Sequence, residues 1–256
     1  EIGSGLVGSE MCIRDSSLTG GVGASLALLG KQVLCLDGDV GLRNLDITLG
    51  MTDAALMDFS DVMAGRCDLS RAAVPHPTVS GLHLLTAPLT LPGDFPGEAG
   101  FQALLQQARE AYDYVLIDSP AGLGPGFRLA VCGADRAIVV AVSDPSSLRD
   151  AQRVVTQLSQ LETIHLVVNR VRPRLLRRQN TTIDDAMDTA GLPLLGLVPE
   201  DPKVVLAATE GRPLAQLGAR RGAVRAYENI ARRLCGQRVP LMNCLLYTSD
   251  AADDLI

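Results

Sequence analysis

Short apolar runs alternate along this chain with longer amphipathic stretches, and this alternation predicts the fold. The apolar runs are four to six residues long, and most end at Asp, Asn, Ser or Pro, which is typical of strands. The predicted strands are Val33–Leu36, Leu82–Leu85, Tyr114–Ile117, Ala137–Val142, His165–Val168 and Leu194–Val198. The amphipathic stretches predict helices at Ser17–Leu29, Ala54–Met63, Phe101–Ala111, Ser146–Leu161, Ile183–Thr189, Lys203–Thr209 and Gly222–Leu234.

Strands that alternate with helices predict an α/β fold, with a mostly parallel sheet and helices on both of its faces. Pro-rich connectors at 87–97 and 172–174 interrupt the pattern without dividing it into two cores. No internal repeat is visible. We therefore expect one domain over residues 17–242, a length that can bury a full core.

Two acidic side chains follow the first predicted strand directly. Asp37 and Asp39 flank Gly38 at what should be the carboxyl end of a parallel strand, the edge where open α/β sheets bind ligands. Carboxylates at this spacing suit a Mg²⁺-phosphate site, where one supports the metal's waters and the other orients an attacking water. The alternative is a loop that uses Asp and Gly as turn residues.

A third carboxylate favours a Mg²⁺-phosphate site over a plain turn at Asp37 and Asp39. The apolar strand Tyr114–Ile117 ends in Asp118, as in a Walker B strand, whose terminal Asp lies beside the Mg²⁺ of the nucleotide. The Pro-Ala-Gly run at 120–122 then predicts a mobile loop near a γ-phosphate.

With these motifs the chain resembles the MinD branch of the MinD/ParA family of deviant-Walker P-loop ATPases. The resemblance runs in order over about residues 17–242. It is carried by LDGDVGLRNLD ending at Asp46, YDYVLIDSPAGLGPGF ending at Phe127, SDPSSLRDAQR from Ser143 to Arg153, Val168-Asn-Arg170 and Gly196–Pro202. It implies a P-loop NTPase-type sheet, ATP and Mg²⁺ as cofactors, and a switch that dimerises with ATP in division-site placement.

The resemblance also assigns roles to residues. Asp39 would position the attacking water, Asp37 would support the Mg²⁺ shell, and Asp118 would hold the metal through water. The residues expected at the adenine base are Asn169, Arg170, Pro199, Glu200 and Asp201, although a plain strand-ending turn is the alternative for Asn169. Ser143–Arg153 resembles the family's interface segment. The implied partners are a second copy of the chain, a division inhibitor and a topological regulator protein, and no nucleic acid is expected.

The phosphate-binding loop of the family, K-G-G-x-G-K-[ST], has no counterpart in this sequence. The chain has two lysines, Lys31 and Lys203, and neither lies in a glycine-rich loop. Gly20-Gly-Val-Gly23 is read as the small-residue face of the first helix, packed closely on the sheet. Gly3–Gly8 has the glycine spacing but no basic residue after it. We therefore expect the first strand and the loop to be missing, and the chain as it stands to be inactive.

The two ends are expected to be foreign to the family. Residues 1–16 and 243–256 resemble translated sequencing-adapter sequence, and such segments are set aside in fold reasoning. A genuine pair of divergent tails is the alternative. The tails hold six of the 29 acidic residues and one of the 23 basic ones, so the body is near neutral and its charge indicates no partner.

Other residue types narrow the function. The cysteines form no C-x-x-C pair, which disfavours the iron-sulfur carriers built on the same fold, and scattered thiols fit the cytoplasm. Peripheral attachment to the inner face of the cell membrane is a further expectation from the resemblance. The basic run Arg170–Arg178 is read as a solvated face, with anionic lipid or a partner protein as alternatives.

Two functions compete with the division ATPase. A MinD-like regulator of flagellar number shares most of the same motifs, and GLRNLD does not separate the two. A nucleotide-independent scaffold, or pseudo-ATPase, follows if the chain truly begins as written. A lysine-containing phosphate loop directly before Ser17 in an extended reading frame would favour the ATPase.

Overall fold

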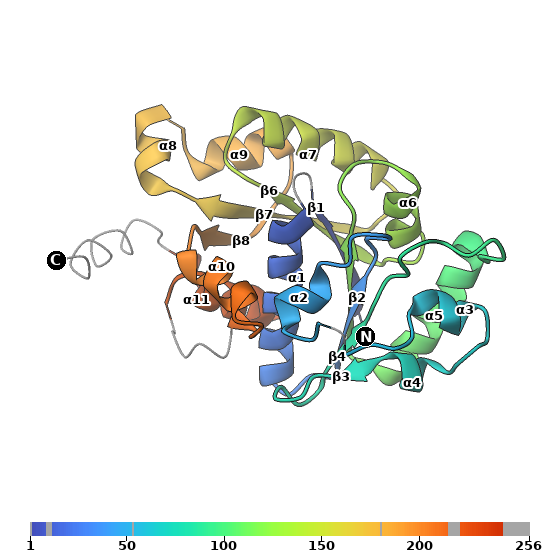
Figure 1. Cartoon of the computed structure of the whole chain (residues 1–256). Helices are drawn as coiled ribbons and strands as arrows, with labels where there is room; N and C mark the ends of the chain where they lie inside the picture. Colours follow the sequence, from blue (N-terminus) through green and yellow to red (C-terminus); the bar gives the residue numbers. More distant parts are fainter. Residues whose placement is uncertain (1, 9–11, 53, 180, 215–220, 243–256) are drawn as a thin grey trace.

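The fold is a single eight-stranded sheet between helical layers, seen in a computed structural model that describes residues 2–8, 12–52, 54–179, 181–214 and 221–242 (Figure 1). The strand order is β3-β4-β2-β5-β1-β6-β7-β8, and every neighbouring pair is parallel except β3 with β4. The predicted α/β class with a mostly parallel sheet is confirmed. The strands are β1 Ile2–Gly8, β2 Val33–Asp37, β3 Val74–Pro75, β4 Leu82–Leu85, β5 Tyr114–Ser119, β6 Arg136–Ala141, β7 Thr163–Val171 and β8 Leu194–Pro199.

Helices connect most of these strands and cover both faces of the sheet, so strand residues are buried on either side. In β2, Leu34 and Leu36 join one core cluster, whereas Val33 and Cys35 join the other. The helices are α1 Cys12–Leu28, α2 Leu45–Leu49, α3 Phe59–Met63, α4 Leu69–Ala72, α5 Gly97–Ala111, α6 Pro125–Val131, α7 Pro145–Gln157, α8 Pro173–Gln179, α9 Ile183–Ala190, α10 Pro202–Thr209 and α11 Gly222–Leu234.

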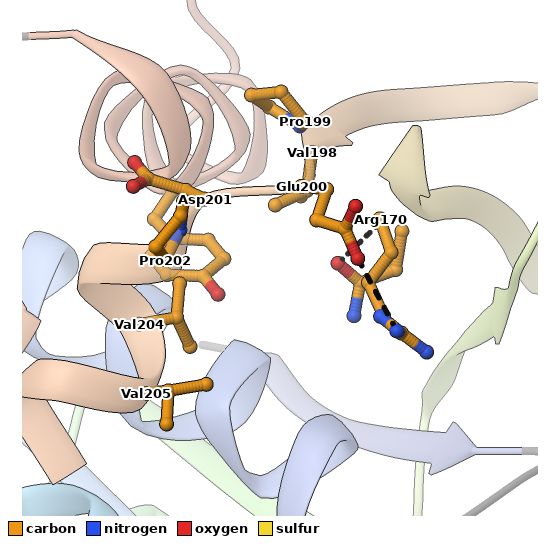
Figure 2. Close-up of a pocket in the computed structure, with 10 residues that line it drawn as sticks. Arg170, Val198, Pro199, Glu200, Asp201, Pro202, Val204 and Val205 are labelled. Atoms are coloured by element: carbon orange, nitrogen blue, oxygen red, sulfur yellow. Dashed lines mark hydrogen bonds and ion pairs between the residues drawn. The ribbon is translucent and has the colours of Figure 1, made fainter. Parts of the chain in front are cut away.

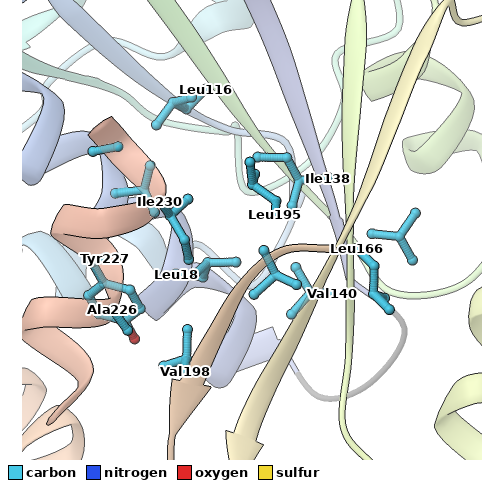
Figure 3. Close-up of a cluster of buried hydrophobic side chains, with 14 of the residues drawn as sticks. Leu18, Leu116, Ile138, Val140, Leu166, Leu195, Val198, Ala226, Tyr227 and Ile230 are labelled. Carbon is cyan, nitrogen blue, oxygen red and sulfur yellow. The ribbon is translucent and has the colours of Figure 1, made fainter. Parts of the chain in front are cut away.

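The first helix packs closely against the last helix and the sheet, and its glycines predicted the contact with the sheet. A Cβ atom on Gly21 would lie 2.2 Å from the Tyr227 ring in α11, and one on Gly23 would lie 2.4 Å from Cys35 Sγ in β2. Figure 3 shows Leu18 of α1 beside Tyr227 and Ile230 in the apolar cluster under these helices. The predicted close packing on the sheet is confirmed at Gly23, whereas Gly20 meets α2 and Gly21 meets α11.

The expectation that the first strand is missing is wrong for this structure. Ile2–Gly8 forms β1 between β5 and β6, with Ile2 opposite Tyr114 and Ser4 opposite Arg136, and α1 begins at Cys12 instead of Ser17. The physical reason is that β5 and β6 both have backbone N–H and C=O groups directed at this position. Backbone pairing satisfies these groups with little dependence on side-chain identity. The foreign origin of residues 1–16 stays a prediction.

Several boundaries differ from the predicted ones for local reasons. The helix expected over Ala54–Met63 begins only at Phe59, because the Asp58 side chain accepts hydrogen bonds from the backbone N–H groups of Ser60 and Asp61 and caps α3 there. Four short helices, α2, α4, α6 and α8, have no counterpart among the predicted elements. Two of these, α6 and α8, begin at a proline, a residue that suits the first position of a helix, and Pro173 lies in the connector predicted at 172–174.

Candidate functional site

The carboxylates predicted from two separate motifs meet at the carboxyl ends of β2 and β5. Asp37 lies opposite Asp118 in the parallel register, and the Gly38 N–H donates to the backbone oxygen of Asp118 at 2.8 Å. A Cβ atom on residue 38 would lie 2.7 Å from that oxygen, so glycine permits the close approach. Asp39 follows directly and is mostly buried. The structure therefore brings Asp37, Asp39 and Asp118 together.

Asp37 is fully buried and holds the loop that follows it. One of its carboxylate oxygens accepts from the Asp39 N–H at 2.9 Å, and the other accepts from the Leu45 N–H at 3.2 Å, where α2 begins. Burial raises the pKa of Asp37 to about 6, although the two N–H donors act in the opposite direction. Both oxygens are thus engaged by backbone, and this geometry suits a residue that shapes the loop bearing Asp39.

Asp118 is tied by a hydrogen bond to the first helix, which packs against β5. The Thr19 hydroxyl donates to Asp118 Oδ1 at 2.9 Å, and both side chains are buried. Sequence reasoning missed Thr19, because the two residues lie far apart along the chain. The one available signal was a hydroxyl residue beside the glycines of the close-packed face of α1.

A hollow of about 400 Å³ lies farther along the same sheet edge, after β7 and β8 (Figure 2). All five residues predicted at the adenine base line it, although nothing in the structure tests that role. The lining residues are Asn169, Arg170, Val198, Pro199, Glu200, Asp201, Pro202, Val204, Val205 and Tyr227. Sequence reasoning missed Tyr227, which reaches the hollow from α11.

Backbone geometry at the end of β7 directs the side chains around this hollow. Arg170 has a positive φ of 52°, uncommon for a residue with a side chain, and its N–H donates to Asn169 Oδ1 at 2.9 Å. Glu200 accepts from both Arg170 and Arg172. These guanidiniums, chiefly that of Arg172, lower the pKa of Glu200 and keep it ionised.

Asp201 fixes the opposite wall of the hollow. Its carboxylate accepts from the N–H groups of Lys203 at 3.0 Å and Ala223 at 3.0 Å, so it joins the start of α10 to the start of α11. Gly222 has a φ of 61°, and a Cβ atom there would lie 2.2 Å from the Asp201 carboxylate. In Figure 2, Asp201 and Glu200 point to different sides of the loop.

The oxygen donors at β2 and β5 suit a hard cation that keeps most of its waters. Asp39, Asp118 and Thr19 offer carboxylate and hydroxyl oxygens, the ligand type that Mg²⁺ prefers. Among the residues that the structure describes, no group of three or more His, Cys, Asp or Glu side chains forms a metal site. The residues therefore fit a Mg²⁺ ion that a nucleotide and water hold in large part, rather than an all-protein cage.

Neither lysine lies in a glycine-rich loop. Lys31 follows the carboxyl end of α1, and Lys203 is in the first turn of α10. The predicted interface segment forms most of α7, whose first turn is capped by Asp144. Within the described ranges, no helix is long and apolar enough to cross a bilayer.

Comparison with known proteins places these features in a family. The model of the CobQ/CobB/MinD/ParA nucleotide binding domain matches residues 16–214. The septum site-determining protein MinD of Bacillus subtilis is 38% identical over 234 residues, covering 90% of this chain and 87% of that protein. The MinD of Synechocystis sp. is 36% identical over 234 residues, covering 90% of this chain and 88% of that protein.

A solved structure agrees with the sequence relatives. In the MinC:MinD cell division protein complex of Aquifex aeolicus, one chain superposes with a TM-score of 0.87 at 32% identity. The match covers 95% of the present chain and 99% of that one.

Proposed function

Because the chain belongs to the family of CobQ/CobB/MinD/ParA nucleotide-binding domains, we propose that its parent protein is a division-site placement ATPase that dimerises when it binds ATP. The observation that carries the proposal is the hydrogen bond from Thr19 to Asp118, beside Asp37 and Asp39. This cluster lies on the sheet edge where open α/β folds bind ligands.

The carboxylates take different parts in this proposal. Asp118 would hold the metal through water, and Asp39 would orient the water that attacks the γ-phosphate. Asp37 would support the metal shell indirectly, because both of its oxygens hold the loop that bears Asp39. Bound Mg²⁺ would supply charge neutralisation at the phosphates.

The hollow at β7 and β8 is the proposed site of the adenine base. Its volume of about 400 Å³ lies in the usual range for small-ligand sites. Asn169 and Arg170 form one wall, and the loop Pro199–Asp201 forms the other. A purine placed there would lie on the same sheet edge as the carboxylates, so one nucleotide could reach both.

We propose partners from the relatives as well. A second copy of the chain and a division inhibitor of the kind seen in the A. aeolicus complex are the first two, with a topological regulator as a third. Ser143–Arg153, which contains most of α7, is the proposed interface segment. The proposed location is the cytoplasm, with peripheral attachment to the inner face of the cell membrane.

The chain with its present sequence is proposed to bind ATP weakly and not to hydrolyse it. The sequence has Asp15-Ser16 directly before Ser17, where the resemblance places Lys-Thr, so the lysine that would neutralise the phosphates is absent at this position. Isothermal titration calorimetry with ATP and Mg²⁺ tests this. Clear one-to-one binding in the micromolar range would refute it.

A restored chain tests the ATPase itself. With a family-type front end containing K-G-G-x-G-K-[ST] in place of residues 1–16, we expect ATP binding, hydrolysis and ATP-dependent dimerisation. Asp39→Ala should leave ATP binding largely intact and slow hydrolysis, because water positioning matters mainly in the transition state. Asp118→Ala should also weaken binding of the Mg²⁺-nucleotide. Asp94→Ala, at an exposed loop residue, is the control and should change neither.

Sedimentation with and without ATP measures the dimer. The Asp39 variant should accumulate as the ATP-bound dimer, whereas the restored parent should cycle between dimer and monomer. Undiminished turnover in the Asp39 variant, or a restored chain that stays monomeric with ATP, would contradict the assigned switch.

A nucleotide-independent scaffold is the second candidate, favoured by the missing phosphate-loop lysines. It predicts that the chain as it stands binds its protein partner equally well with and without ATP. A pull-down with the division inhibitor, with and without ATP, separates the two functions.

A further inference from the structure

A second hollow of about 420 Å³ lies beside the proposed nucleotide pocket, at the start of α8. Its lining combines three arginines with an apolar wall and a single acid. The lining residues are Val171, Arg172, Pro173, Arg174, Leu175, Arg178 and Glu200. Glu200 also lines the neighbouring pocket, so the two hollows share one wall.

The charge at this hollow is strongly positive after its internal ion pairs are counted. Glu200 is occupied by Arg170 and Arg172. Arg174 and Arg178 form no ion pair with any residue that the structure describes, and both are exposed. They are four residues apart on α8, so they lie on the same face, where two like charges repel each other. A bound anion would relieve this repulsion.

The hollow is held in place by backbone bonds. The Glu200 N–H donates to the Val171 oxygen at 3.1 Å, which joins the ends of β7 and β8. The N–H groups of Leu175 and Leu176 donate to the Arg172 oxygen at 2.9 and 3.1 Å, which anchors the first turn of α8. The ion pair with Arg172 also fixes the side chain of Glu200, which lies between the two hollows. A ligand would therefore meet an ordered wall.

We propose that this hollow binds a phosphate-bearing anion, of the diphosphate or phosphate-monoester class, through Arg174 and Arg178. Guanidinium groups present paired N–H donors that match phosphate oxygens, and two of them suit a dianion better than a single carboxylate. Val171, Pro173 and Leu175 give the hollow an apolar wall that an ester group could contact. The site does not depend on the ATPase proposal, because it needs neither the phosphate loop nor Asp39.

The test uses the chain as it is and inorganic pyrophosphate as the probe. Calorimetry at low salt should show one pyrophosphate bound per chain. Arg174→Gln with Arg178→Gln should weaken it by about tenfold or more, because two charged hydrogen-bonding groups are lost. The matched control is Arg71→Gln with Arg128→Gln, which removes the same charge from exposed positions on α4 and α6. Binding in the control should stay within about twofold.

Vesicles distinguish the two sources of the phosphate group. Cosedimentation with phosphatidylcholine vesicles that contain phosphatidic acid, against phosphatidylcholine alone, presents a phosphate monoester on a lipid. Retention that requires Arg174 and Arg178 assigns the site to a headgroup. Pyrophosphate binding without retention assigns it to a soluble ligand. The proposal is overturned if neither probe binds, or if the control pair of substitutions weakens binding as much as the test pair. Circular dichroism checks that all variants are folded.

Discussion

His76 shows how a single side chain can organise a loop without taking part in chemistry. Its Nδ1 accepts from the N–H groups of Thr78 and Val79 at 3.2 and 3.1 Å, so its Nε2 carries the proton and donates to the Leu49 oxygen at 3.0 Å. The ring is buried. This arrangement requires neutral imidazole, because a protonated Nδ1 could not accept the two backbone bonds.

The pH dependence of stability should follow from this requirement. Burial lowers the pKa of His76 below its ordinary 6.5. Near pH 6.5 this histidine therefore becomes protonated in the unfolded chain but stays neutral in the folded chain. The contribution of neutral His76 to the free energy of unfolding is therefore fully present above pH 6.5. It is lost as the pH falls through 6.5 towards the pKa of His76 in the folded state. Urea unfolding at pH 7.5 and 5.5 measures it. His76→Gln should lose less stability between these values, and an equal loss would contradict the assignment.

Gly21 tests the packing of α1 against α11. Gly21→Ala places a methyl group 2.2 Å from the Tyr227 ring, so the ring or the helix must move. Overpacking of this kind costs about 1–3 kcal/mol in the free energy of unfolding. Gly93→Ala is the control, because no atom lies within 4 Å of its built Cβ, and it should be nearly neutral. Thermal unfolding of both variants checks the contrast, and equal melting temperatures would refute close packing at residue 21.

At the scale of elements, the caps decide where helices begin. Asp58 forms a capping box with Asp61, since each side chain accepts from the other's backbone N–H. Asp68 stands at the equivalent position of α4 and makes no side-chain cap hydrogen bond. The two aspartates therefore look alike in sequence but differ in the structure.

This pair offers a matched prediction. Asp58→Ala should lower the free energy of unfolding by about 1 kcal/mol, because the N–H groups of Ser60 and Asp61 lose their acceptor. Asp68→Ala should cost only a few tenths of a kcal/mol. Chemical denaturation of both variants gives the comparison. A loss at Asp68 as large as that at Asp58 would mean that capping is not the cause.

Apolar runs in the sequence predicted the main strands closely, because a strand buried on both faces needs apolar residues throughout. Val33–Leu36 became β2 with one further residue, Asp37. The sequence could not predict β3, a two-residue strand with a proline, because it exists only by pairing with β4. No signal in the sequence predicted α6, a seven-residue helix that begins at Pro125, just after the loop predicted from the Pro-Ala-Gly run at 120–122.

At the scale of the whole molecule, the tendency of open α/β sheets to bind ligands at the carboxyl ends of their strands predicted which distant residues would meet. Asp37 and Asp118 were expected at one edge because each ends a parallel strand, and the register places them opposite each other. The Thr19 bond to Asp118 was beyond sequence reasoning, because it depends on how α1 crosses the sheet. The strand at Ile2–Gly8 was also missed, since its place is defined by the neighbours that it pairs with.

The strand order also has a kinetic consequence. β6, β7 and β8 are consecutive both in the chain and in the sheet, with Arg136 opposite Thr163, whereas β1 pairs Ile2 with Tyr114. Closing the longer loop costs roughly 1 kcal/mol more in chain entropy, so the long-range pairing should form later. In pulse-labelled hydrogen exchange during refolding, amides of β6–β8 should be protected before those of β1. Simultaneous protection would exclude this order. In the expected order, β1 is synthesised before β5 and β6 but is among the last strands to pair with its neighbours in the sheet.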